Sequence, residues 1–358
     1  MKIGILLHPF GEKKPAGLSR AIWELTRAIL ARDSKNEYVI FLRKKLSEPL
    51  DLPGCNWRVE ILDKKFFWLD RGLEKSPPLD IYVFNTPILP LFFKPKRSIA
   101  ILYDFAYKKF KAESLKEFFK NLLLFWYHIF SIKKADKIIA ISRATKEDII
   151  KFAGIDEQKI KVMMLGFNRI CALPEEKIET SQKFFLTVGV IKERKNVLGT
   201  VQAFGEFAKT NQDFKLVIAG KGQGNYFKRI KDFIKKERMA DKAIFLDQVS
   251  DNQLCYLYKR ARALVYPSFC EGFGLPILEA MDCGLPVITS NISSLPEVAG
   301  EAAFLIDPFD PNQIAKAMEK IAQDDKLRQY LSQVGRARAQ EFSWEKTAGN
   351  FLEIIENS

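Results

Sequence analysis

The sequence predicts an α/β protein made of two doubly wound domains, each with a parallel sheet covered by helices. The chain has 358 residues, 47% of them hydrophobic, which is enough for two cores of ordinary domain size. Strand-length apolar runs alternate with helix-compatible segments, as in proteins with parallel sheets. This alternation occurs in both halves of the chain.

The first half opens with KIGILLH (residues 2–8), an apolar run of strand length. A loop containing Gly17 follows, and then the helical pattern SRAIWELTRAIL. Four more strands are predicted at EYVIFL, DIYVFN, SIAILYD and KIIAIS. We therefore expect residues 1–172 to form a Rossmann-like domain.

The second half repeats the alternation with shorter gaps. Its predicted strands are FFLTVG, FKLVIAG, AIFLDQV, ALVYPS, PVITS and AAFLID. A Pro- and Glu-rich stretch, CALPEEKIETSQK, marks the boundary, so the second domain is expected at residues 173–342. The last segment, residues 343–358, reads as a helix with Ser343 as its N-cap, long enough to pack back on the first domain.

The charge is unevenly distributed along the chain. Residues 1–172 hold 32 Lys and Arg against 19 Asp and Glu, and the rest of the chain is balanced at 25 against 25. This asymmetry indicates either an anionic partner (nucleic acid, a membrane surface or a phosphorylated acceptor) or simply a solvated lysine-rich surface. No apolar run reaches the roughly 18 residues that span a bilayer, and the start of the chain lacks a signal-peptide pattern. We expect a cytoplasmic protein.

Cysteine and histidine usage argues against a metal centre. The two histidines are His8 and His128, and no pair of cysteines has CxxC spacing. A zinc site is therefore not expected, and a disulfide framework still less so. The cysteines are Cys55, Cys171, Cys255, Cys270 and Cys283.

Ligands of open parallel sheets bind beyond the carboxyl ends of the strands, so the loops there are candidate sites. Arg194 and Lys195 follow FFLTVG and its Gly189, and two adjacent cations suit a diphosphate. Gly220 opens a GxGxG turn after the next strand, and Val249 follows the strand after that, where its backbone can meet a base edge. Each of these signals is weak alone.

EGFGLPILE, from Glu271 to Glu279, is the most informative segment. A helix is predicted from Pro276 to Cys283, with Gly284 at its αL end. Because glycines precede this helix, its N-terminal N–H groups and dipole are open to a phosphate. The two carboxylates suit the hydroxyls of a sugar and a ribose on either side of that phosphate.

These residues resemble those of retaining glycosyltransferases of family 4, which have the GT-B fold of two Rossmann-like domains facing a central cleft. The similarity is strongest from Phe185 to Pro308, where EGFGLPILE, VGVIKERKN and SNISSLPEVAGEAAFLIDPFD match the family in order. It implies that Glu271 contacts the donor sugar and Glu279 the ribose, that Arg194 and Lys195 neutralise the diphosphate, and that the backbone of Phe273, Gly274 and Leu275 lies against sugar and phosphate.

In the first half, AGLSRAIWEL is similar to the family's glycine loop, which implies that Gly17 faces the donor phosphate or the acceptor. The family usually has His-Asp where this chain has Tyr103-Asp104. These two residues are the acceptor-side candidates. The departure means that either Tyr103 takes over the polar contact or the acceptor is handled unusually, and it leaves an inactive relative as an alternative.

The resemblance implies transfer of a hexose from a nucleotide-diphosphate sugar, with retention and without an obligatory metal or other cofactor. The form of VGVIKERKN is similar to mannosyltransferase-like members and favours GDP-mannose over a UDP-sugar. The expected acceptor is a glycan or a polyprenyl-diphosphate-linked lipid used in cell-surface polysaccharide or glycolipid synthesis. A nucleotide-sugar epimerase or hydrolase of the same fold is the main alternative.

Two segments of the first half interleave aromatic and basic residues, namely KKFFWLDRGLEK (residues 64–75) and SLKEFFKNLLLFWYHIFSIKK (residues 114–134). They suit either an interfacial helix on an anionic membrane or a buried helix with an ordinary loop. We therefore hypothesise peripheral attachment to the inner face of the plasma membrane. No helix-turn-helix or RNP signature indicates nucleic-acid binding.

Overall fold

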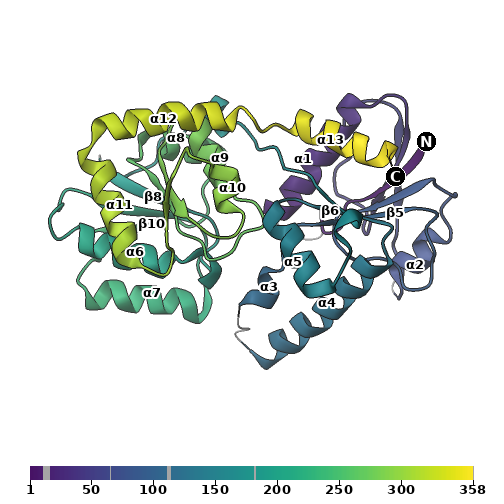
Figure 1. Cartoon of the computed structure of the whole chain (residues 1–358), viewed down its shortest axis with the longest axis horizontal. Helices are drawn as coiled ribbons and strands as arrows, with labels where there is room; N and C mark the ends of the chain where they lie inside the picture. Colours follow the sequence, from purple (N-terminus) through teal and green to yellow (C-terminus); the bar gives the residue numbers. More distant parts are fainter. Residues whose placement is uncertain (11–16, 65, 111–113, 181–182, 358) are drawn as a thin grey trace. The chain divides into compact units, whose positions relative to one another are not determined.

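The computed structural model describes residues 1–10, 17–64, 66–110, 114–180 and 183–357. It divides into two compact units (Figure 1). Unit 1 comprises residues 1–166 and 342–358, and unit 2 comprises residues 167–341. The sequence placed the first boundary at 172/173. In the structure residues 167–172 belong to unit 2, because their 3₁₀ turn packs against helices of that unit.

Unit 1 has a seven-stranded sheet in the order β3-β2-β1-β4-β5-β6-β7, and every strand pair is parallel. The connection from β3 to β4 takes the chain from one half of the sheet to the other, so the strand order reverses between the neighbouring strands β1 and β4. The strands are β1 (Lys2–Leu6), β2 (Glu37–Leu42), β3 (Trp57–Ile61), β4 (Ile81–Phe84), β5 (Ser98–Leu102), β6 (Lys137–Ala140) and β7 (Ile160–Val162).

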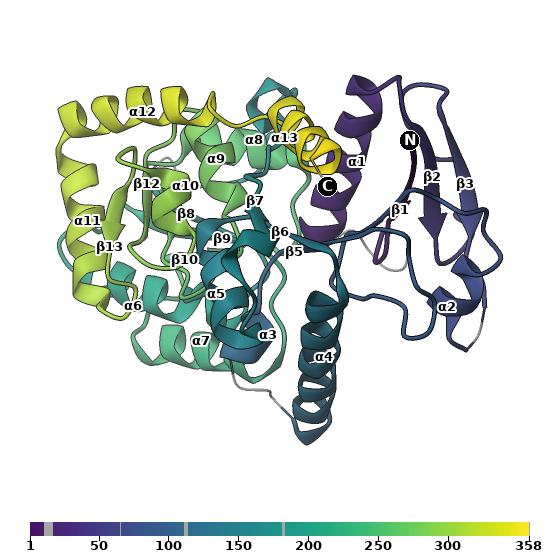
Figure 2. The same cartoon turned by 45° about the vertical axis from the view of Figure 1, so that its right-hand side comes forward.

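Helices cover this sheet and bury two apolar clusters. One cluster lies over β1, β2 and β4, and the other lies between β5, β6 and two of the helices, α4 and α5. The last helix packs against the first (Figure 2), and Ser343 caps it by accepting a hydrogen bond from the Lys346 N–H. The helices are α1 (Gly17–Arg32), α2 (Trp68–Leu73), α3 (Ala106–Lys109), α4 (Leu115–Lys134), α5 (Arg143–Ala153) and α13 (Trp344–Glu356).

Unit 2 repeats the strand order with a six-stranded parallel sheet, β10-β9-β8-β11-β12-β13. Its four central strands, β9, β8, β11 and β12, are almost wholly buried because helices cover the sheet, which is why they appear in the sequence as continuous apolar runs. The strands are β8 (Phe184–Val188), β9 (Lys215–Ala219), β10 (Ala243–Phe245), β11 (Leu264–Tyr266), β12 (Val287–Ser290) and β13 (Phe304–Ile306).

The core of unit 2 lies beneath α6, α7 and α11. The segment that opens with Glu271 leads into α9, which begins one residue earlier than predicted and ends at Asp282. The helices are α6 (Val197–Phe207), α7 (Gly224–Lys236), α8 (Asp251–Arg260), α9 (Leu275–Asp282), α10 (Leu295–Ala299), α11 (Pro311–Gln323) and α12 (Asp325–Ala339). The prediction of two doubly wound parallel-sheet domains is confirmed.

The sequence missed two strands, β3 and β7, which lie at the two edges of the unit 1 sheet. Strand β7 has only three residues, and β3 pairs only with β2, through residues that are exposed or half-buried. An edge strand of this kind carries Arg58 and Glu60 among its apolar residues, so it lacks the continuous apolar signal of the central strands.

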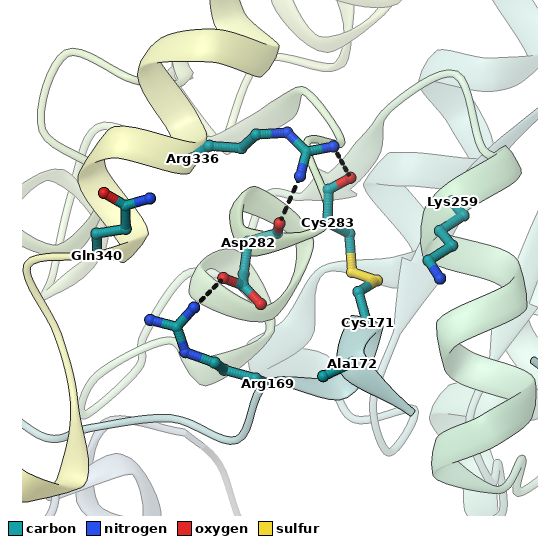
Figure 3. A pocket seen from close by; sticks show the side chains of 8 residues that line it. All are labelled: Arg169, Cys171, Ala172, Lys259, Asp282, Cys283, Arg336 and Gln340. Carbon is teal, nitrogen blue, oxygen red and sulfur yellow. Dashed lines mark hydrogen bonds and ion pairs between the residues drawn. A yellow bond between two sulfur atoms is a disulfide. The ribbon is translucent and has the colours of Figure 1, made fainter. Parts of the chain in front are cut away.

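A disulfide joins Cys171 to Cys283, with 5.4 Å between their Cα atoms. The sequence had argued against disulfides, and for this pair it was wrong. The two residues are 112 positions apart, and only the packing of the 3₁₀ turn Ile170–Ala172 against the end of α9 brings them together. Figure 3 shows the disulfide in a pocket lined also by Arg169, Lys259, Asp282 and Arg336.

We expect replacement of both disulfide cysteines by serine to lower the free energy of unfolding of unit 2 by about 2–4 kcal/mol, because the bridge restricts the unfolded chain. Urea unfolding followed by circular dichroism measures this. A reducing agent should lower the free energy of unfolding of the wild type to that of the variant. Cys55→Ser, which removes an exposed free thiol, is the control and should change nothing. Stability that does not respond to reductant would contradict the prediction.

Candidate functional site

Three predicted residues meet at the centre of the unit 2 sheet. Glu271 lies just beyond the carboxyl end of β11, and Arg194 and Lys195 lie beyond the end of its neighbour β8. The strand order reverses between these two strands, which is where ligands bind in open parallel sheets. The Arg194 Nη1 atom lies 2.7 Å from Glu271 Oε2, and the Lys195 Nζ atom lies 2.6 Å from Glu271 Oε1.

The loops that carry these residues are fixed to each other. The backbone N–H of Phe269 donates to the carbonyl of Arg194 (2.8 Å), and the Arg194 guanidinium donates to the carbonyl of Cys270 (3.2 Å). On the other side, the Ser293 and Ser294 hydroxyls donate to the Glu271 carbonyl at 2.8 and 3.0 Å. The site is therefore held by backbone contacts that do not depend on a ligand.

Glu271 is buried, with 8% of its surface exposed. Burial alone would raise the pKa of its carboxyl group, but the Lys195 and Arg194 cations hold that pKa below its ordinary value. Glu271 is thus ionised at neutral pH. The three side chains together carry one positive charge, so the site as a whole attracts an anion.

A close contact between two loops requires glycine at Gly220. A Cβ atom there would lie 2.0 Å from the carbonyl oxygen of Gly189, and the Gly189 N–H donates to the Ala219 carbonyl at 2.9 Å. Gly189 itself has a positive φ of 116° and lies against Lys195. Gly189, Gly220 and the Arg194–Lys195 turn therefore form one continuous surface.

No described side chain caps the N-terminus of α9 with a hydrogen bond. Gly274 is its N-cap residue with φ 121°, and Leu275 and Pro276 begin the helix. A Cβ on Gly274 would approach the Leu295 side chain to 2.9 Å, so only glycine fits here. Phe273 is buried, and its carbonyl accepts a hydrogen bond from the Ser294 hydroxyl at 2.8 Å. At the other end of the helix Gly284 has φ 75°, as predicted for the αL position.

Glu279 lies one turn inside α9, half-buried, and accepts a hydrogen bond from the Tyr258 hydroxyl at 3.1 Å. Val249 lies half-buried just before Ser250, the N-cap of α8. Asn196 caps α6 through its side-chain oxygen, which accepts a hydrogen bond from the Gly199 N–H at 3.2 Å. The ligand contacts predicted for Glu279 and Val249 remain predictions.

The other candidates belong to unit 1. Gly17 is the first residue of α1, and no described atom lies within 4 Å of the place where its Cβ would stand. Tyr103 and Asp104 follow β5. Asp104 accepts a hydrogen bond from the Ala106 N–H at 2.9 Å, whereas the buried Tyr103 hydroxyl has no hydrogen-bond partner among the described residues. Burial raises the pKa of Tyr103, so its hydroxyl stays protonated.

Sequence reasoning missed two residues of the site, Tyr266 and Tyr258. The Tyr266 hydroxyl donates to Glu271 Oε1 at 3.0 Å and also contacts Lys195 Nζ. Tyrosine at the end of a buried strand or on a helix usually belongs to the core, and only the spatial position of each hydroxyl distinguishes these two.

Among the residues that the structure describes, no group of three or more His, Cys, Asp or Glu side chains could hold a metal ion.

Comparison with known sequences gives a family match over unit 2. Residues 172–338 match the family model described as "Glycosyl transferases group 1". O-antigen chain mannosyltransferase B of Escherichia coli is 35% identical over 225 residues, which are 60% of this chain and 59% of that protein. The serotype-specific mannosyltransferase WbdA of Escherichia coli is 31% identical over 66% of this chain and 30% of its own length. The chain thus matches less than two thirds of these relatives.

Solved structures match over the whole chain. Sucrose-phosphate synthase from Thermosynechococcus elongatus has a TM-score of 0.78 at 20% identity, covering 99% of this chain and 98% of its own. Anabaena HepE, solved in complex with UDP and glucose, also has a TM-score of 0.78, at 17% identity and with 100% of both chains covered. These likenesses confirm the predicted GT-B fold.

We expect Glu271→Gln to lower the free energy of unfolding at pH 7 by about 1–3 kcal/mol, because it leaves Arg194 and Lys195 without the charge between them. The Glu271 pKa is lowered in the folded state, so its stabilising effect is complete above about pH 4.5 and is lost as the pH falls through the folded-state pKa. The difference between wild type and variant should therefore shrink in urea unfolding below pH 4.5.

Glu193→Gln is the matched control, because Glu193 lies in the same turn but is half-exposed. Its effect should stay within about 0.5 kcal/mol at every pH. A difference for Glu271→Gln that is unchanged between pH 7 and pH 3.5 would show that the ionised carboxylate does not stabilise the fold.

Proposed function

We propose that this chain, whose residues 172–338 are a glycosyltransferase group 1 domain, transfers a hexose from a nucleotide-diphosphate sugar to a glycan or lipid-linked acceptor. The observation that carries the proposal is the cluster of Arg194, Lys195 and Glu271 beside the N-terminus of α9, which has no side-chain cap among the described residues. It offers two cations and a helix N-terminus to a diphosphate, and carboxylates to the hydroxyls at either end.

In the proposed donor complex, Arg194 and Lys195 bind the diphosphate, and Gly189, Gly220 and the backbone from Phe273 to Leu275 lie along it. Glu271 accepts from sugar hydroxyls and Glu279 from the ribose. Val249 faces the base, and Gly17 faces the phosphate or the acceptor. The family resemblance implies these roles, and the places of Arg194, Lys195 and Glu271 at the strand ends support them.

The reaction breaks the bond between the anomeric carbon and the β-phosphate oxygen, while positive charge grows on the sugar ring and negative charge on the phosphate. Arg194, Lys195 and the dipole of α9 stabilise that negative charge, at about a few kcal/mol for each well-placed group. The acceptor oxygen forms a bond to the anomeric carbon on the same face of the sugar, and the departing phosphate takes the proton of that hydroxyl. Transfer then proceeds with retention and without a nucleophile or metal from the protein. Tyr103 and Asp104 are the acceptor-side candidates in this proposal.

For the donor we propose GDP-mannose first. The names of the relatives support mannose as the transferred sugar. The two described above are mannosyltransferases that are 31–35% identical to this chain over the matched residues. Their names also support an acceptor in cell-surface polysaccharide synthesis. A screen of thermal stability against UDP, GDP, ADP and their sugars tests the choice, because a ligand at 100 times its dissociation constant stabilises a protein by about 2.7 kcal/mol.

We expect Arg194→Ala or Lys195→Ala to lower transfer more than tenfold, because each removes a cation from the departing phosphate. Initial rates with the donor found in the thermal screen measure this. Arg229→Ala, which removes an exposed cation paired with Glu193 at 3.7 Å, is the control. Near-normal turnover in either variant would remove that residue from the proposed role, and nucleotide release without any acceptor would instead support a hydrolase or epimerase.

Unit 1 carries an apolar surface that suits a membrane. One face of α4 is buried against β5 and β6, yet its other face exposes large apolar side chains, with Leu123 74% and Trp126 61% exposed. The exposed set on this helix is Leu115, Phe118, Phe119, Leu122, Leu123, Trp126 and Phe130. No helix in the described part of the chain has the length and hydropathy needed to cross a bilayer.

A second apolar point lies nearby on unit 1. The rings of Phe67 and Phe92 are in edge contact (5.5 Å between centroids) and both are exposed. Lys134 at the end of α4 holds the loop of Phe92 to the helix by donating to the carbonyls of Pro90 and Leu91 at 2.6 and 3.0 Å. Of the first predicted membrane segment, Lys65 lies outside the described residues.

We propose that these two apolar points insert among the headgroups of an anionic bilayer. Charge complementarity supports this occupant, because the surplus of 13 positive charges lies in residues 1–172 and lysines flank the exposed face of α4. The protein would then work at the inner face of the plasma membrane, where lipid-linked acceptors are found. The alternative is that α4 is an ordinary buried helix beside a solvated lysine-rich surface. It does not account for the seven exposed apolar residues on this helix.

We expect Phe119→Ser/Leu123→Ser/Trp126→Ser to weaken binding to vesicles containing anionic lipid at least tenfold, because each apolar side chain buried in the interface contributes about 1.5–3 kcal/mol. Vesicle sedimentation at low salt measures this. Tyr330→Ser, which removes an exposed ring from α12 of unit 2, should bind like the wild type. A wild type that does not bind anionic vesicles would overturn the membrane proposal and leave the donor proposal intact.

A further inference from the structure

Each carboxylate of the Glu271–Glu279 segment accepts a hydrogen bond from a buried tyrosine. Tyr266 donates to Glu271 Oε1 at 3.0 Å, and Tyr258 donates to Glu279 Oε2 at 3.1 Å. The two tyrosines are 3% and 1% exposed. Burial raises the pKa of both hydroxyls, and the neighbouring carboxylates raise it further, so each hydroxyl keeps its proton and acts as a donor.

Tyr266 is fixed by the sheet itself. It is the last residue of β11, paired with Thr289 of β12, and the Thr289 hydroxyl donates to its carbonyl at 2.8 Å. The Lys195 ammonium lies over its ring, 4.6 Å from the centroid, and contacts its hydroxyl. One tyrosine therefore contacts both the cation and the carboxylate of the site.

The ion pairs of Glu271 raise a problem for donor binding. Glu271 forms ion pairs with Lys195 through Oε1 and with Arg194 through Oε2. The same two cations are proposed to bind the diphosphate. A carboxylate that loses its cations while it stays buried pays a large desolvation penalty. The Tyr266 hydroxyl is neutral and its residue is fixed in β11. We therefore expect its hydrogen bond to Glu271 Oε1 to persist when the two cations bind the diphosphate.

We propose that Tyr266 is a positioning residue, which holds the Glu271 carboxylate toward the donor sugar once Arg194 and Lys195 engage the diphosphate, and that Tyr258 holds Glu279 toward the ribose in the same way. This inference rests on the proposed function, because it takes the two carboxylates to face different parts of the donor. The two tyrosines should therefore affect different kinetic parameters.

Tyr266→Phe and Tyr258→Phe each remove one hydroxyl and keep the ring. For Tyr266→Phe we expect kcat to fall about tenfold or more while affinity for the nucleoside diphosphate without sugar changes less than threefold, since Glu271 faces only the sugar. For Tyr258→Phe we expect that affinity to fall about tenfold, with kcat at saturating donor changed less than threefold. Steady-state kinetics and titration with GDP or UDP give both quantities.

Tyr226→Phe is the matched control. The Tyr226 hydroxyl is also buried in unit 2, but it accepts from the backbone N–H of Leu198 at 2.9 Å instead of donating to a carboxylate. This variant should retain kcat and affinity within twofold. Urea unfolding of all three variants verifies that each is folded under the assay conditions.

The outcomes separate this inference from the function on which it rests. Wild-type transfer together with an unchanged kcat for Tyr266→Phe would overturn the role of Tyr266 alone. Parallel losses of kcat and affinity in both tyrosine variants would show a structural effect and overturn the division between sugar and ribose. A wild type that neither binds nor uses any nucleotide sugar would overturn the proposed function, and this inference with it.

Discussion

Glu271 is a carboxylate buried at the centre of a parallel sheet, and a buried carboxylate needs both charge and hydrogen bonds to remain ionised. Arg194 and Lys195 supply the charge, and Tyr266 supplies a further hydrogen bond. To bring these groups together, the loops after β8 and β11 must meet where the strand order reverses. The glycine contacts in this region and the serines behind Glu271 serve the same requirement, because each fixes one of these loops.

The sequence predicted most of the fold because central strands of a covered sheet must be apolar along their whole length. FFLTVG and PVITS show this directly. The prediction failed for β3, which lies at an edge and alternates in polarity, and for the Cys171–Cys283 bridge, whose partners are brought together only by tertiary packing. Local signals do not contain such long-range information.

For the site, residue types and strand ends were enough to select Arg194, Lys195 and Glu271, but they did not show that the three side chains pair with one another. Tyr266 and Tyr258 were hidden for a different reason. A buried tyrosine is ordinary in a core, and only the direction of its hydroxyl toward a carboxylate gives it a further meaning. The selection of charged residues from sequence is therefore more complete than the selection of the neutral groups that orient them.

Unit 1 is discontinuous, because α13 packs on α1 although all of unit 2 lies between them in the chain. A ribosome makes α1 and the strands of unit 1 before unit 2, and it makes α13 only after unit 2. Unit 2 is a continuous segment and can reach its final structure while unit 1 still lacks this helix. The face of α1 that packs against α13 therefore stays uncovered until the whole of unit 2 has been synthesised.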